Sequence, residues 1–178
     1  MRGLCPAAVV SKFAAVDSHF LAALEAYDDD AAEICDGLQL LQLHLLVTPT
    51  VLQEIADTER NSTDPDARVA AAAILKDYRG WLILDPPLTP VQNGVAEIMA
   101  KKLIEEEVIP DTELNAGLIV AEAALHECQI LITHRQSLIN SDLTELGLVW
   151  LGAATPPLIV DADSVLKALR DHFETKGR

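Results

Sequence analysis

The sequence has few basic residues and no long apolar run, and each shortage excludes a class of protein. It contains 13 Lys and Arg against 28 Asp and Glu, which gives a formal net charge of −15. The chain therefore has no general electrostatic attraction to nucleic acid or to anionic membranes, and an anionic substrate must be held by local basic groups or bound cations. Its apolar runs are shorter than the about 18 to 20 residues that a membrane span needs.

Cysteines are few as well. Cys5, Cys35 and Cys128 are an odd number without the spacing of a metal site, so we expect reduced thiols. The N-terminal segment LCPAAVV is too short for a signal-peptide core, which predicts a soluble, cytoplasmic protein. A length of 178 residues without a break in composition predicts a single domain spanning residues 1–178.

Three common motifs are missing too. No G-x-G-x-x-G follows the first predicted strand, and no G-x-x-x-x-G-K-[ST] occurs, so dinucleotide and P-loop binding are not expected. A serine nucleophile elbow is also absent.

What the sequence does contain is an alternation of short apolar strands and helices. The clearest unit is Ile109 to Leu138, which reads as acidic helix start, buried helix, apolar strand ILIT and polar loop. Apolar strands without alternation are typical of a parallel sheet covered on both faces. The pattern predicts a three-layer α/β/α fold with a central parallel sheet of about five strands. These strands are expected at residues 13–17, 45–47, 81–84, 130–133 and 149–153, and Thr48-Pro49 and Thr89-Pro90 predict two helix starts.

Acidic residues stand at the junctions between these elements. Asp17 follows the first strand, Glu54 lies early in the helix that Thr48 and Pro49 begin, and Asp111 and Glu113 open the central helix. A helical wheel places Glu113 opposite the stripe of Asn115, Glu122 and His126, and so favours Glu113 as the inward-facing acid. Each acid also has an ordinary structural explanation, as a helix cap, a surface glutamate or a first-turn charge that the helix dipole favours.

Carboxylates gathered at one edge of a sheet repel each other unless a divalent cation lies among them. The four acids therefore predict a site for Mg²⁺ or Mn²⁺, formed by Asp17, Glu54, Asp111 and Glu113. Such a site activates water for attack on a phosphodiester. In α/β folds ligands bind beyond the carboxyl ends of the strands, which here is the loop from Thr133 to Ser137.

Four segments in this order resemble the PIN-domain nucleases, a family that includes toxin-type ribonucleases, over nearly the whole chain. They are AAVDSHFLAAL, LLVTPTVLQEI, DTELNAGLIVAEAALHECQILIT and PPLIVDADSVLKAL. The resemblance implies a catalytic, metal-binding role for Asp17, Glu54 and Glu113, where the alignment can slide to Asp111 or Asn115. It also implies that the last of the four segments closes the domain as a strand and a helix.

The loop after ILIT departs from the family pattern. The family has an aspartate just after the strand's threonine, whereas Thr133 is followed here by His134, Arg135, Gln136 and Ser137. Arg135 adds positive charge where a metal ligand is expected, and Ser137 or Asp142 could compensate. Ser18 fits the family as a hydroxyl close to the metal. The residues expected to bind substrate are Ser18, Thr133, Arg135 and Ser137.

Two functions follow from this pattern. The first is a metal-dependent endoribonuclease that hydrolyses RNA phosphodiester bonds with Mg²⁺ or Mn²⁺. The alternative is a catalytically inactive PIN-fold module for binding or regulation, which the missing fourth acid, Arg135 and the net charge of −15 favour. The resemblance further implies a toxin–antitoxin context, with a small antitoxin-type protein partner and a homodimer.

Overall fold

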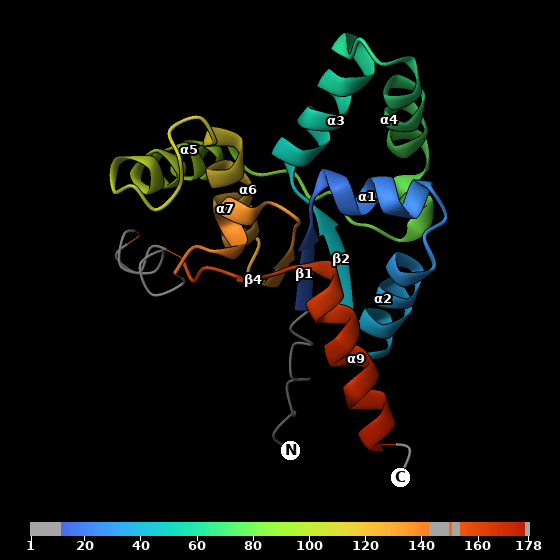
Figure 1. The fold of residues 1–178 in the computed structure, drawn as a ribbon. Helices are drawn as coiled ribbons and strands as arrows, with labels where there is room; N and C mark the ends of the chain where they lie inside the picture. The colour runs from blue at the N-terminus through green and yellow to red at the C-terminus, as the bar shows by residue number, and fades with distance from the viewer. Residues whose placement is uncertain (1–11, 143–149, 151–153, 177–178) are drawn as a thin grey trace, which may run out of the picture.

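A parallel sheet of four strands forms the centre of the molecule (Figure 1). The structure, a computed structural model, describes residues 12–142, 150 and 154–176. The strands are β1 (Lys12–Val16), β2 (Leu43–Val47), β3 (Cys128–Ile132) and β4 (Leu158–Val160), in the order β2-β1-β3-β4. Val16 pairs with Val47 on one side and with Ile132 on the other, so three strands end level with one another. Their carboxyl ends therefore form one edge.

The strands are apolar because helices cover both faces of the sheet. Ala14, Ala15 and Val16 of β1 are completely buried, as are Leu46 and Val47 of β2. Helices α2 (Asp29–Leu40) and α9 (Ala162–Lys176) pack together on one side, and α5 (Pro90–Glu105) and α6 (Leu114–Leu125) lie on the other (Figure 1). The predicted α/β/α arrangement with a parallel sheet is confirmed.

Helix α6 packs closely against α5 and the turn that follows it. A Cβ atom at Gly117 would lie 2.8 Å from Ile109 Cδ1 and 3.2 Å from Ala100 Cβ, so a larger residue there would require the Ile109 side chain and helix α5 to shift. Because the helix is buried on almost every side, any charged residue within it needs a partner.

The other helices are α1 (Ser18–Glu25), α3 (Pro49–Asn61), α4 (Pro65–Asp77), the 3₁₀ turn η1 (Tyr78–Trp81) and the short α7 (Gln136–Ile139). Helices α3 and α4 pack side by side and extend beyond the carboxyl edge of the sheet (Figure 1). None of the helices in the described ranges combines the length and apolar character that crossing a bilayer requires.

Two helix starts lie where the sequence predicts them. Thr48 is the N-cap of α3, and Pro49 is the first residue of that helix. Thr89 is the N-cap of α5, and Pro90 is the first residue of that helix. Thr89 and Gln92 also form a reciprocal capping box. These signals are local, and the structure confirms both.

The strand predicted at residues 81–84 is wrong. Residues up to Trp81 form η1, Leu82 adopts a left-handed backbone with φ of 61°, and only Leu84 makes a bridge, to Leu46. A left-handed residue breaks the extended chain, so the apolar run WLIL cannot pair along its length. The strand predicted at 149–153 lies outside the described residues except for Trp150. The strand implied by the resemblance within PPLIVDADSVLKAL is β4.

Candidate functional site

The predicted site residues lie at the carboxyl edge of the sheet, around the loop that follows β3. Asp17 follows β1, Glu54 is carried by α3, Glu113 precedes α6, and the segment after β3 supplies Thr133, His134, Arg135 and Ser137. We call these residues, with Ser18 and Asn115, the rim. Side-chain hydrogen bonds connect the three carboxylates of the rim to its loop residues, and each carboxylate has its own partners there.

Asp17 is the most deeply buried member of the rim, with an exposed fraction of 1%. Its Oδ1 accepts from the backbone N–H of Phe20 at 3.0 Å, which caps α1. Its Oδ2 accepts from Thr133 Oγ1 at 2.7 Å and from the backbone N–H of His134 at 3.1 Å. His134 Nδ1 lies 2.9 Å from the same oxygen. Asp17 therefore ties the end of β1 to the loop after β3.

Glu54 is held by a cation of the chain itself. Arg135 Nη2 donates to both carboxylate oxygens, at 2.6 Å and 2.7 Å. Ser18 Oγ donates to Oε2 at 3.4 Å, and Asn115 Nδ2 donates to Oε1 at 3.2 Å. The Arg135 and Glu54 side chains are 24% and 17% exposed, so this ion pair is partly shielded from water.

Glu113 and Asp111 are placed differently. Glu113 occupies the N-cap position of α6, does not cap the helix with its side chain, and accepts a hydrogen bond from Ser137 Oγ. Asp111 is exposed in the preceding turn, and no hydrogen bond or ion pair joins it to the described part of the rim. The structure therefore brings Glu113 to the loop and leaves Asp111 outside.

Glu122 is a buried acid that the helical wheel places on the wrong face. It is 5% exposed and accepts from Thr50, from the backbone N–H at 3.0 Å and from Oγ1 at 2.7 Å. The carboxylate thus satisfies the first turn of α3, where the Thr48 side chain makes no capping bond. Glu122 faces α3, and the exposed Asn115 on the same stripe also reaches α3, where it donates to Glu54. The apolar residues all around α6 were the signal that this glutamate is buried.

Two histidines without a predicted role also reach the site. The rings of His19 and His134 stack with centroids 3.8 Å apart, and His134 contacts Asp17. No sequence pattern predicts this pair, because His19 and His134 are far apart in the chain.

The rim, as it is arranged, does not fit a divalent cation. Asp17 is occupied by three donor groups on one oxygen, and Glu54 faces a guanidinium group that repels a metal ion. Across residues 12–142, 150 and 154–176, no group of three or more His, Cys, Asp or Glu side chains is arranged to hold a metal ion. The predicted Mg²⁺ or Mn²⁺ site therefore stays a prediction.

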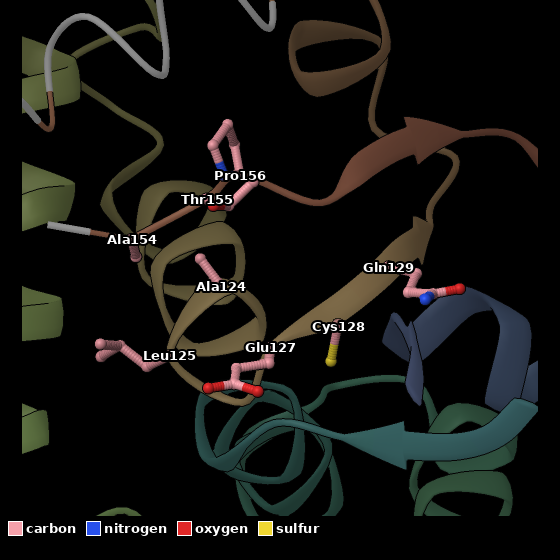
Figure 2. A pocket seen from close by; sticks show the side chains of 8 residues that line it. All are labelled: Ala124, Leu125, Glu127, Cys128, Gln129, Ala154, Thr155 and Pro156. Atoms are coloured by element: carbon pink, nitrogen blue, oxygen red, sulfur yellow. The ribbon is translucent and has the colours of Figure 1, made fainter. Parts of the chain in front are cut away.

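A cavity of about 740 Å³ lies at the other end of β3, away from the rim (Figure 2). Figure 2 shows the lining residues, which come from the end of α6, the start of β3 and residues 154–156. Burial raises the pKa of the Cys128 thiol to about 12, so this cysteine stays protonated at neutral pH and is a poor nucleophile. This cavity therefore offers no reactive group from Cys128.

Comparisons with known proteins identify the fold. No family model matches the sequence, and no curated protein sequence matches it. A similar solved structure is that of VapBC2 from Rickettsia felis bound to a DNA fragment from the promoter. The match has a TM-score of 0.56 and 10% sequence identity, and it covers 84% of this chain and 98% of that chain. The likeness shows a PIN-like α/β fold. It supports the fold that the sequence resemblance implies and does not show membership of the family.

Proposed function

We propose that this chain is a PIN-fold module that binds a protein partner and does not cut RNA. The observation that carries the proposal is the state of Asp17, whose Oδ2 is already filled by Thr133 and His134. A cation that binds through Oδ2 would have to displace one of those donors. Because Thr133 is 2% exposed, displacement of its hydroxyl would cost a buried hydrogen bond.

A pocket beside Asp17 supports a basic segment as the ligand. It has a volume of about 200 Å³, and its lining combines acids, two histidines and apolar side chains, among them Asp17, Asp28, Asp30, Asp163, His19, His134, Phe20, Ile34 and Leu166. Asp28 caps α2 and Asp30 pairs with Arg170, so Asp163 is the acid best placed to receive a new cation. Lys and Arg combine an apolar stem with a charged head and therefore match such a lining.

The similarity to VapBC2 also supports a protein partner. The solved structure carries the VapBC2 name and contains a promoter DNA fragment, and the fold of this chain resembles it. We therefore propose an antitoxin-type protein as the partner. The net charge of −15 on this chain would speed the association of the chain with a basic segment of the partner.

A cleavage assay tests the first half of the proposal. Labelled single-stranded RNA is incubated with the protein in millimolar Mg²⁺ or Mn²⁺ and in EDTA. We expect the same low background in all three conditions, for the wild type and for Asp17→Asn. Cleavage that requires metal and disappears in Asp17→Asn would overturn the proposal.

A binding titration tests the second half. The probe is an arginine-rich peptide, and the control peptide has glutamate in place of arginine. We expect Asp163→Asn to weaken binding of the basic peptide about threefold, with a further loss at high salt. Glu97→Gln, a change at an exposed acid on α5, serves as the matched control. Equal affinities for Asp163→Asn and Glu97→Gln would contradict this use of the pocket.

A metal-dependent endoribonuclease is the second candidate. It is favoured by the presence of Asp17, Glu54 and Glu113 around one loop, reached through Thr133, Arg135 and Ser137. Catalysis with Mg²⁺ or Mn²⁺ would require Arg135 to leave Glu54, and the cleavage assay decides between the two functions. The homodimer stays a prediction, which sedimentation tests directly.

A further inference from the structure

Arg135 is held in place by the same loop that closes over Asp17. Its backbone N–H donates to Thr133 Oγ1 at 3.1 Å, and that hydroxyl donates to Asp17. Arg135 then begins the short helix α7. The position of the guanidinium therefore depends on a fixed backbone and not only on the attraction of Glu54.

The contact with Glu54 is unlike a surface ion pair. Arg170 and Glu33 have the same chemistry, with contacts at 2.9 Å and 2.6 Å, but their side chains are 51% and 46% exposed. Water screens such an exposed pair, and its net effect is small. Arg135 and Glu54 are considerably less exposed, and Arg135 Nε is buried without a hydrogen-bond partner among the described residues.

We propose that Arg135 is a built-in counter-ion, which neutralises Glu54 and thereby keeps divalent cations out of the rim. The inference rests on the proposed function, because it concerns the same site. It explains how a carboxylate can remain half-buried at the edge of a parallel sheet without a metal ion. Under this proposal one residue of the loop after β3, Arg135, decides whether the rim can bind a divalent cation.

The groups around Glu54 show what removal of the charge would leave. Ser18 contributes a hydroxyl and Asn115 an amide, and both already contact the carboxylate. The carboxylate, the hydroxyl and, after rotation of the amide, the carbonyl oxygen of Asn115 are oxygen ligands of the kind that Mg²⁺ and Mn²⁺ accept together with water. With a neutral residue at position 135, the free charge of Glu54 would therefore attract such a cation.

Titration calorimetry with Mn²⁺ tests the inference on the full chain. The variants are Arg135→Gln, which removes the charge, Arg135→Lys, which keeps it, and the double variant Arg135→Gln/Glu54→Gln. Arg170→Gln is the matched control, since it breaks the exposed pair on α9. We expect Arg135→Gln to bind Mn²⁺ about tenfold more tightly than the wild type. The other variants should resemble the wild type.

Thermal unfolding with and without Mn²⁺ provides a second reading on the same proteins. Mn²⁺ should raise the midpoint of Arg135→Gln alone, because a ligand that binds only the folded state stabilises it. The inference is overturned if Arg135→Gln gains no Mn²⁺ affinity, or if the wild type binds Mn²⁺ equally well. RNA cleavage by the wild type would contradict the proposed function instead, so the two failures are distinguishable.

Discussion

The Asp17 half and the Glu54 half of the rim use the same chemical group in different ways. Asp17 is 1% exposed, and its partners are backbone N–H groups, a threonine hydroxyl and a histidine ring. Glu54 is partly exposed, and its main partner is the guanidinium of Arg135. The first arrangement joins elements of the fold, whereas the second balances a charge.

The difference shows which carboxylate can exchange its partner. Removal of Asp17 would leave a buried hydroxyl and a helix end without an acceptor, and both defects are costly. Glu54 can find water or another cation if Arg135 moves, because part of its side chain is already exposed. Changes at Asp17 should therefore affect stability, and changes at Glu54 should affect ligand choice.

The largest expected effect is at Asp17. Asp17→Ala removes the cap of α1 and the acceptor for Thr133, so we expect a loss of about 3 kcal/mol in the free energy of unfolding. Urea unfolding measures this loss. Asp17→Asn keeps one acceptor oxygen and should lose less. A loss below about 1 kcal/mol for Asp17→Ala would contradict a structural role.

Glu122 should behave like Asp17, although it lies outside the rim. Glu122→Gln weakens the charged acceptor for the first turn of α3, and we expect a loss of about 1 to 2 kcal/mol in urea unfolding. Thr50→Val removes the hydroxyl donor and keeps the backbone N–H, so Glu122→Gln should cost less in the Thr50→Val background than in the wild type. If the two losses simply add, the carboxylate does not act through the Thr50 hydroxyl.

A double-mutant cycle at Glu54 and Arg135 should give a smaller energy. The pair is less exposed than a surface salt bridge, so we expect a coupling of about 1 kcal/mol that decreases at high salt. Unfolding of Glu54→Gln, Arg135→Gln and the double variant measures it. Coupling that is absent at low salt would show that Arg135 is not the counter-ion of Glu54.

The smallest effect concerns pH and lies outside both halves of the rim. Burial lowers the pKa of His126 below its ordinary value of 6.5. The folded state thus resists a proton that the unfolded state accepts, so stability is full above 6.5 and decreases as the pH falls toward the folded pKa. We expect a loss below about 1 kcal/mol in wild type that His126→Gln does not show. Identical pH profiles for both proteins would exclude this contribution.

Local signals in the sequence were sufficient for much of the fold. Thr48 with Pro49 and Thr89 with Pro90 act on the first turn of their own helices, and both starts are confirmed. The strand predicted for the run WLIL is wrong, because strand pairing depends on the adjacent strands of the sheet and the left-handed Leu82 interrupts the extended chain. The sequence contains no pattern that predicts the left-handed backbone at Leu82.

The candidate site was predictable in position and less so in chemistry. Parallel strands that end together bring junction residues to one edge, so Asp17, Glu54 and the loop after β3 could be anticipated there. The opposite charges of Arg135 and Glu54 were visible, but their contact joins residues 81 positions apart. The burial of Glu122 was missed because the wheel treated α6 as a helix with one solvent face.

The anomalous difference density of a crystal soaked in millimolar Mn²⁺ shows whether Arg135 keeps divalent cations out of the rim. We expect no manganese peak beside Glu54, with Arg135 still donating to both carboxylate oxygens of Glu54. A manganese ion bound by Asp17 and Glu54, with Arg135 displaced from the rim, would contradict this role of Arg135.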